Sequence, residues 1–217
     1  MKEIYLDNAA TTKVDEKVVK AMLSYFGEKY GNASSSHGVG KIARDAIEKA
    51  RAEIAKSINA KPEEIFFTSG GTESNNWAIK ELFFVNMNSG KKHIITTKIE
   101  HPSITEVCEM LKHLGAKTTY LYVDKEGFID LKQLEKSIEK DTLLVSIIHG
   151  NNEIGTIQNL EEIGKITRKH GIYLHADACQ SYCKTKIDVE KQNNDLLTLN
   201  SHKIHGPKGV GSLFIRK

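Results

Sequence analysis

Short apolar runs alternate along this chain with longer segments in which apolar residues recur every three or four positions. The short runs are typical of buried strands, and the longer segments are typical of amphipathic helices. We predict seven strands, at residues 65–68, 93–97, 118–123, 143–149, 172–177, 196–200 and 211–215. Strands that alternate with helices indicate right-handed crossovers. The predicted fold class is therefore α/β, with a mainly parallel seven-stranded sheet flanked by helices.

Three segments are the clearest predicted helices. Residues 39–58 carry one apolar stripe, made by Ile42, Ala46, Ile47, Ala50, Ile54 and Ile58. Residues 103–114 carry a similar stripe and follow Pro102, which the first turn of a helix accepts. Residues 160–170 end at Gly171, a natural residue just beyond a helix.

Composition and charge narrow the function classes. Apolar residues make up 39% and charged residues 27% of the 217 residues, which is ordinary for a globular protein. The formal net charge is only +3 and no dense basic run occurs, so we expect no nucleic-acid partner. No stretch approaches the roughly 18 uninterrupted apolar residues of a membrane span, so we expect no membrane association.

The three cysteines, Cys108, Cys179 and Cys183, cannot all pair within one chain. The charged and polar start of the chain is unlike a signal peptide, so we interpret the cysteines as reduced and predict a cytoplasmic location. Cys108 falls on the apolar side of its predicted helix and is expected in the core.

Candidate chemistry gathers in five loops that follow predicted strands. Ligands of parallel α/β sheets bind at the carboxyl ends of the strands, so these loops should be considered together. Their unusual residues are Gly70, Gly71 and Thr72, then His101, then Asn151 and Asn152, then Asp177, and last Lys203.

Each of these residues also has a plainer interpretation. Gly71 and Thr72 suit a phosphate at a helix N-terminus, but Thr is an ordinary helix cap too. A planar His101 could stack on a ligand, yet a single His is more often structural. Asp177 is costly at the end of a buried strand unless it meets a cation. Lys203 could be a solvated charge or a nucleophilic amine.

Taken together, the five loops fit pyridoxal 5′-phosphate (PLP). Lys203 would form a Schiff base with the cofactor, and Asp177 would pair with its protonated pyridine nitrogen. The helix that starts near Gly71 would hold the phosphate. No single element is specific for PLP, but their convergence on one edge of the sheet is.

Seven motifs follow one another along the chain: YLDNAATT, SSSHGVGKIARDAIEKAR, FTSGGTESNN, EHPSI, NNEIGTIQ, HADACQ and SHKIHGPKGVG. In these motifs the chain resembles the NifS/IscS group of cysteine desulfurases, which are fold-type I PLP enzymes of the class V aminotransferase family. The SGGTESNN and NNEIG forms resemble this group more than the SufS/selenocysteine-lyase branch.

The resemblance implies a role for each matching position. Lys203 would be the Schiff-base lysine, and His101 would stack on the ring and assist proton transfer. Asp177 would pair with the pyridinium nitrogen. Gln180 would hydrogen-bond the phenolic oxygen, and Asn152 would lie beside the cofactor and the substrate carboxylate. The phosphate would be held by Gly71, Thr72, Ser201 and His202.

The resemblance also implies an activity, partners and a domain division. The family converts L-cysteine to L-alanine and passes the sulfur to an enzyme cysteine as a persulfide, for iron–sulfur cluster assembly or thiolation. A homodimer and a sulfur-acceptor or iron–sulfur scaffold protein would be the partners. Residues 1–14 would be an arm of the small domain, and residues 15–217 would be most of the PLP-binding large domain.

The chain departs from the family pattern in one respect. The catalytic cysteine and the arginine for the substrate carboxylate lie in the C-terminal part of family members, beyond the position that matches Lys217. Cys179 or Cys183 would be a poor substitute, because persulfide chemistry needs a mobile, exposed thiolate. We therefore expect a cofactor site without the catalytic cysteine, and little sulfide formation by this chain alone.

Two other functions stay open. One is a related PLP enzyme, such as a selenocysteine lyase, a cysteine sulfinate desulfinase or an aminotransferase. The other is a truncated paralogue that binds PLP, or a partner protein, without turnover. A dinucleotide-binding G-x-G-x-x-A pattern at residues 38–43 does not follow a strand and is set aside. The spacing of His202, His205, Cys179 and Cys183 is irregular for zinc, so we predict no metal.

Overall fold

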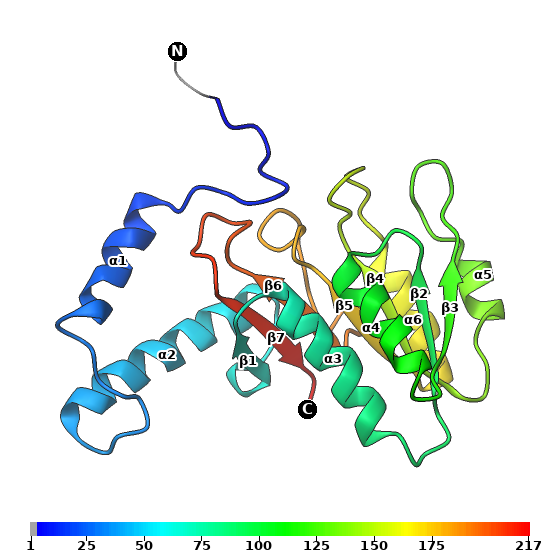
Figure 1. Ribbon diagram of the computed structural model, residues 1–217, viewed down its shortest axis with the longest axis horizontal. Coiled ribbons are helices and arrows are strands. Elements are labelled where there is room, and N and C mark those ends of the chain that lie inside the picture. Colours follow the sequence, from blue (N-terminus) through cyan, green and yellow to red (C-terminus); the bar gives the residue numbers. More distant parts are fainter. Residues whose placement is uncertain (1–3) are drawn as a thin grey trace.

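The computed structural model describes residues 4–217, whose seven strands form one sheet in the order β1-β7-β6-β5-β4-β2-β3 (Figure 1). The strands are β1 (Ile65–Thr68), β2 (His93–Thr97), β3 (Lys117–Leu121), β4 (Thr142–Ile148), β5 (Tyr173–Asp177), β6 (Leu196–Asn200) and β7 (Gly211–Ile215). Strand β7 runs antiparallel to β1 and β6, and the other neighbours pair in parallel. The predicted mainly parallel seven-stranded α/β sheet is confirmed.

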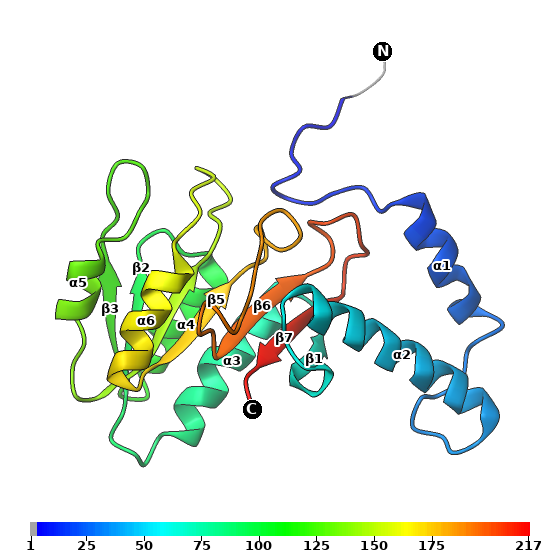
Figure 2. The same ribbon diagram turned by 180° about the vertical axis from the view of Figure 1, so that it is seen from behind.

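Helices cover both faces of this sheet (Figures 1 and 2). They are α1 (Glu16–Phe26), α2 (Gly38–Ser57), α3 (Gly71–Val85), α4 (Pro102–Lys112), α5 (Leu131–Lys136) and α6 (Leu160–His170), with a 3-10 turn at Pro62–Glu64. Helices α3 and α4 enclose one apolar cluster with Phe83 and Leu111. Helices α5 and α6 and the end of α2 enclose the other cluster, on the opposite face, with Leu134 and Ile163.

Local sequence signals explain where two of the helices begin and end. The side chain of Asn159 accepts a hydrogen bond from the backbone N–H of Glu162 and caps the start of α6. The same helix ends at Gly171, whose φ of 64° lies in the left-handed region that glycine adopts without strain. Helix α4 begins at Pro102, directly after its cap residue His101, so the predicted start was one residue late.

The bounds of β4, β5 and α2 differ from the predicted ones by one residue, and two other predictions differ from the structure for a physical reason. Strand β3 ends at Leu121 rather than at residue 123, because Asp124 accepts hydrogen bonds from the N–H groups of Glu126 and Phe128 and turns the chain. The apolar stripe of α2 packs on the sheet only near its C-terminal end. Ile42 and Ile47 are 50% and 40% exposed, because α1 and the first part of α2 project beyond the edge of the sheet (Figure 1).

No helix within residues 4–217 is both long enough and apolar enough to cross a membrane.

A close approach between α6 and the turn before β6 can be tested. A Cβ atom at Gly164 would overlap the carbonyl group of Gln192, so we expect Gly164→Ala to lower the free energy of unfolding by about 1–3 kcal/mol. Gly38→Ala is the matched control, because that helical glycine has open space around it. Urea denaturation of both variants checks this, and equal stabilities would contradict it.

Candidate active site

A cavity of about 540 Å³ opens at the carboxyl edge of the sheet and brings together eight of the nine predicted site residues. They are Gly71, Thr72, His101, Asn152, Asp177, Gln180, His202 and Lys203. The cavity receives residues from the ends of β2, β4, β5 and β6 and from the start of α3, because parallel strands direct their following loops to one edge. Lys203 and Asp177 thus line a single cavity, as PLP chemistry requires.

Asp177 is the buried anion of this cavity, with 4% of its surface exposed. Its Oδ1 accepts a hydrogen bond of 2.9 Å from the backbone N–H of Cys179, and its Oδ2 accepts one of 2.8 Å from Nδ2 of Asn75. No salt bridge to Asp177 occurs within residues 4–217. A buried carboxylate held only by neutral donors is suited to a cationic partner supplied by a ligand.

The start of α3 forms the second part of the cavity. A Cβ atom at Gly71 would overlap Sγ of Cys179, so only glycine lets the first turn of α3 approach the end of β5 this closely. The first N–H groups of a helix have no intrahelical partner, and they meet the positive end of the helix dipole. Gly71 and Thr72 therefore bring anion-binding groups to the cavity wall.

The Lys203 loop is tied to the N-terminal arm. The backbone N–H and the hydroxyl of Thr12 both donate to the carbonyl of His202, each at 2.8 Å, and the N–H of His205 donates to the Thr12 hydroxyl at 2.7 Å. Burial first, and then the charges of Lys203 and Lys208, lower the pKa of His202. His202 is therefore held toward its neutral form beside Lys203.

Ser201 is the predicted site residue that does not line the cavity. Its hydroxyl donates to the carbonyl of Val210 at 3.0 Å and also contacts the carbonyl of Pro207, so it closes its own loop. A contact with a phosphate would require the hydroxyl to leave these carbonyls. The phosphate contact predicted for Ser201 therefore stays a prediction.

Gln180 and Asn152 line the cavity through side chains that already have partners. The amide of Gln180 donates to the carbonyl of Ala9 at 2.7 Å and accepts from Nζ of Lys184 at 3.2 Å. The amide of Asn152 donates to the carboxylate of Glu153. The roles predicted for these two residues stay predictions.

Several cavity residues were missed by sequence reasoning. They are Asp7, Ala9, Ala10, Asn75, Ser103, Ile148, Gly150, Glu153 and Asn200, while Cys179 had been considered only as a sulfur acceptor. Asn75 offered a signal, because it shares the buried face of α3 with Ala78 and Ile79, where a polar residue is unusual. The small residues of the arm offered none, because nothing local to them indicates that the arm crosses the cavity.

The cysteines behave as reduced thiols of three kinds. Cys108 is fully buried in the core as predicted, and burial raises its pKa to about 12. Burial and the nearby Asp177 raise the pKa of Cys179 well above its usual range, which keeps this thiol neutral and weakly nucleophilic. Cys183 is exposed and is not among the residues that line the cavity.

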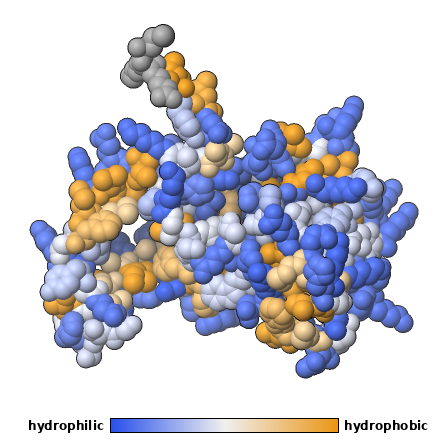
Figure 3. All heavy atoms as spheres, in the orientation of Figure 1, coloured by the Kyte–Doolittle hydropathy of each residue, from blue (hydrophilic) through white to orange (hydrophobic). Residues whose placement is uncertain are grey.

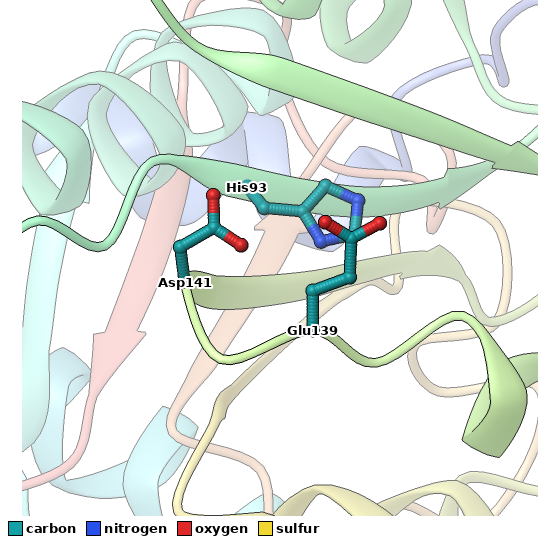
Figure 4. A group of neighbouring side chains, drawn as sticks. All are labelled: His93, Glu139 and Asp141. Atoms are coloured by element: carbon teal, nitrogen blue, oxygen red, sulfur yellow. The ribbon is translucent and has the colours of Figure 1, made fainter.

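One cluster within the described residues has metal-ligand chemistry, and it lies away from the cavity, at the opposite ends of β2 and β4 (Figure 4). It consists of His93, Glu139 and Asp141. Both ring nitrogens of His93 are engaged by threonine hydroxyls, at 2.8 and 2.9 Å, and Glu139 pairs with Lys117. These bonds give the cluster a structural role, and we assign no metal to it.

Residues 4–217 match the family model of the class-V aminotransferases. The chain belongs to this family. It is 51% identical to a cysteine desulfurase IscS of Dictyoglomus turgidum and 49% identical to the mitochondrial cysteine desulfurase of Saccharomyces cerevisiae. These matches cover 100% and 99% of this chain, but only 55% and 43% of the two relatives, so the chain spans about half the length of the relatives.

Solved structures of the family have the same fold. A NifS-like protein superposes with a TM-score of 0.96 at 44% identity, over 100% of this chain and 60% of that protein. The structure of SspA in complex with cysteine superposes with a TM-score of 0.95 at 42% identity, over 97% of this chain and 60% of that one. The fold is therefore that of the NifS-like PLP enzymes.

PLP is the cofactor of this family, and the cavity fits it. Two buried amide oxygens at the cavity, Oδ1 of Asn75 and Oδ1 of Asn200, have no hydrogen-bond partner within residues 4–217. Buried polar atoms normally have a partner, so these two indicate that a polar group belongs here. Asp177 would pair with the pyridine nitrogen, and the start of α3 would bind the phosphate. Lys203 would attach to the carbonyl carbon. When bound, PLP withdraws electrons from an amino acid attached to it.

Glu100, beside His101, is a buried acid that joins two of the cavity loops. Its Oε1 accepts hydrogen bonds from the Thr97 hydroxyl at 2.6 Å and from the Ile148 N–H at 2.9 Å, whereas its Oε2 is buried without a partner in the described part of the chain. Burial, assisted by the charge of Asp177, raises the pKa of Glu100 from 4.5 to about 8. Glu100 is therefore a neutral acid at pH 7.

This raised pKa predicts a pH-dependent stability. The native chain binds a proton that the unfolded chain has released, so the contribution of Glu100 is fully present below pH 4.5 and is lost as the pH rises through about 8. We expect Glu100→Gln to flatten this decline and to raise the free energy of unfolding above pH 8 by about 1–3 kcal/mol. Urea denaturation from pH 5 to 9 measures it.

The matched control is Glu106→Gln, the same chemical change at an exposed position of the neighbouring helix. It should leave the pH dependence unaltered. An identical decline in the Glu100→Gln variant and the parent would show that Glu100 is ionised in the folded chain.

Proposed function

We propose that the chain is the cofactor-binding part of a cysteine desulfurase, which converts L-cysteine to L-alanine and passes the sulfur on as a persulfide. The single observation that carries the proposal is that Lys203 and Asp177 line one cavity together with the start of α3. The desulfurase names of the relatives and the cysteine complex of SspA support cysteine as the substrate. Residues 15–217 would be the large domain and residues 1–14 an arm of the small domain.

We assign each residue of the cavity a role according to its position. Asp177 would orient the cofactor and favour a protonated ring nitrogen, and Lys203 would hold the cofactor and accept the α-proton of the substrate at Nζ. His101 lines the cavity at an exposed position, where its ring would cover the cofactor. Neither Cys179, which is buried with a raised pKa, nor Cys183, which does not line the cavity, is assigned as the sulfur acceptor.

Partners and location follow from the same proposal. A persulfide must be passed to a thiol-bearing acceptor or to an iron–sulfur scaffold protein. The three free thiols suit a reducing compartment, either the cytoplasm or one such as the mitochondrial compartment of the yeast relative. Iron–sulfur cluster assembly is one fate for the sulfur, and thiolation is the other.

The exposed apolar surface of α1 supports a homodimer. Helix α1 has no buried residue, and Leu23 and Phe26 are 60% and 78% exposed. Hydrophobic side chains gather over this part of the molecule in Figure 3, next to the exposed stripe of α2. Apolar surface of this extent marks an interface, and a second copy of the chain is the occupant we propose.

Covalent attachment of PLP tests the cofactor site. After incubation with PLP, the parent chain should show visible absorbance, and borohydride reduction should fix the cofactor to the peptide that contains Lys203. Lys203→Ala should lose both signals, whereas Lys208→Ala, which removes an exposed lysine of the same loop, should keep them. Mass spectrometry of the reduced peptides measures the result, and a label retained in Lys203→Ala would refute the assignment.

The proposed dimer is tested by charge placed on α1. Leu23→Asp should shift the chain from dimer to monomer in sedimentation velocity. Burying an unpaired charge in an apolar interface should weaken the free energy of association by about 2 kcal/mol or more. Val85→Asp is the control, since Val85 is 82% exposed at the far end of α3. A parent chain that sediments as a monomer, or an unaltered Leu23→Asp variant, would contradict the proposal.

A further inference from the structure

A row of buried polar side chains connects Asp177 to His101 across the floor of the cavity. Asn75 lies on α3. Its Nδ2 donates to Oδ2 of Asp177 at 2.8 Å and to Oγ of Ser103 at 2.9 Å. Oγ of Ser103, on α4, lies 2.8 Å from Nδ1 of His101. Asn75 and Ser103 are only 1% and 7% exposed, so water does not compete for the two bonds of Asn75.

The donors and acceptors along this row can be assigned. An ionised carboxylate only accepts hydrogen bonds, so the atom of Asn75 that faces Asp177 must be the NH₂ group. The second hydrogen of this group is directed to Oγ of Ser103, which therefore accepts. The single hydrogen of the Ser103 hydroxyl is then left to donate to Nδ1 of His101.

A second bond from Ser103, which shares the same lone pair of Nδ1, agrees with this assignment. The backbone N–H of Ser103 donates to Nδ1 of His101 at 3.1 Å, as part of the cap at the start of α4. A backbone N–H can only donate, so Nδ1 must offer its lone pair. A proton on Nδ1 would face this N–H group. It would also face the hydrogen of the Ser103 hydroxyl, which the bond from Asn75 directs toward His101.

We propose that Asn75 and Ser103 are positioning residues that hold His101 as the tautomer protonated at Nε2 and join it to the carboxylate of Asp177. His101 then presents an N–H group, and not a lone pair, to the cavity that it lines. Two hydrogen bonds from Ser103 hold its ring, and Asn75 links Ser103 to Asp177.

A consequence for catalysis rests on the proposed desulfurase function. A neutral His101 of this tautomer can donate a hydrogen bond to the cofactor or to the substrate, but its basic nitrogen is occupied by Ser103. Removal of the α-proton therefore falls to Lys203 alone. Asn75 also orients Asp177, so its loss should weaken the hold on the pyridine nitrogen.

The tautomer can be measured without any cofactor. In the ¹⁵N-labelled chain, long-range ¹H–¹⁵N correlation spectra distinguish protonated from unprotonated ring nitrogens, and a His101→Gln variant identifies the His101 signals. Above the pH at which the ring loses its charge, we expect one tautomer, with the proton on Nε2. A proton on Nδ1, or a mixture of the two tautomers, would overturn the proposal.

Variants test whether Ser103 and Asn75 cause this state. Ser103→Ala should move the Nδ1 resonance toward that of an unbonded imine nitrogen, because the hydroxyl donor is gone, and Ser103→Thr should restore it. Asn75→Leu should move it in the same direction by a smaller amount. The control is Ser74→Ala, which removes another buried hydroxyl of α3, bonded to Thr68 at 2.8 Å. Unchanged Nδ1 resonances in Ser103→Ala and Asn75→Leu would refute the assigned row.

A measurement of PLP binding distinguishes a failure of this inference from a failure of the proposed function. Asn75→Leu should weaken PLP binding roughly tenfold, the effect of one lost hydrogen bond to a charged group, while Ser74→Ala should not. Equal PLP affinity of Asn75→Leu and the parent would count against the positioning of Asp177. A parent chain that binds no PLP would refute the proposed function instead, and the spectra would still decide the tautomer.

Discussion

A single buried carboxylate places the strongest physical demand on this structure. Asp177 lies at the end of a central strand, almost fully removed from water, and its protein partners are a backbone N–H and a side-chain amide. An anion so placed costs free energy unless a positive charge reaches it. Three features surround Asp177 and leave room for a cationic ligand: the cavity, the lysine loop after the neighbouring strand, and the close approach of α3.

The parallel sheet explains how the other groups meet Asp177. Strands β2, β4, β5 and β6 run in one direction, so the loops that follow them share an edge. Glu100 fastens the end of β2 to the end of β4 through the hydroxyl of Thr97 and the N–H of Ile148. The arm, which bonds to His202 and Gln180 from residues far away in the sequence, lies across the same edge. The site is thus a property of the sheet edge rather than of one loop.

Burial has different consequences for the titratable groups around the cavity. It raises the pKa of Glu100 and of the Cys179 thiol, so both are neutral near pH 7, and it lowers the pKa of His202. The raised pKa of Cys179 explains why a cysteine so near the cavity is a poor nucleophile.

The sequence by itself determined the strand order along the chain, the helix signals at Pro102 and Gly171, and the loops that carry Lys203 and Asp177, because periodicity and turn residues are local. It did not place the end of β3, which a turn at Asp124 decides, or reveal that α2 leaves the sheet. It predicted a phosphate contact for Ser201, whose hydroxyl bonds to carbonyls of its own loop, and that contact stays a prediction. It also missed Asn75 and Ser103. Asn75 bonds to residues 28 and 102 positions away, and only tertiary packing brings such distant donors and acceptors within reach.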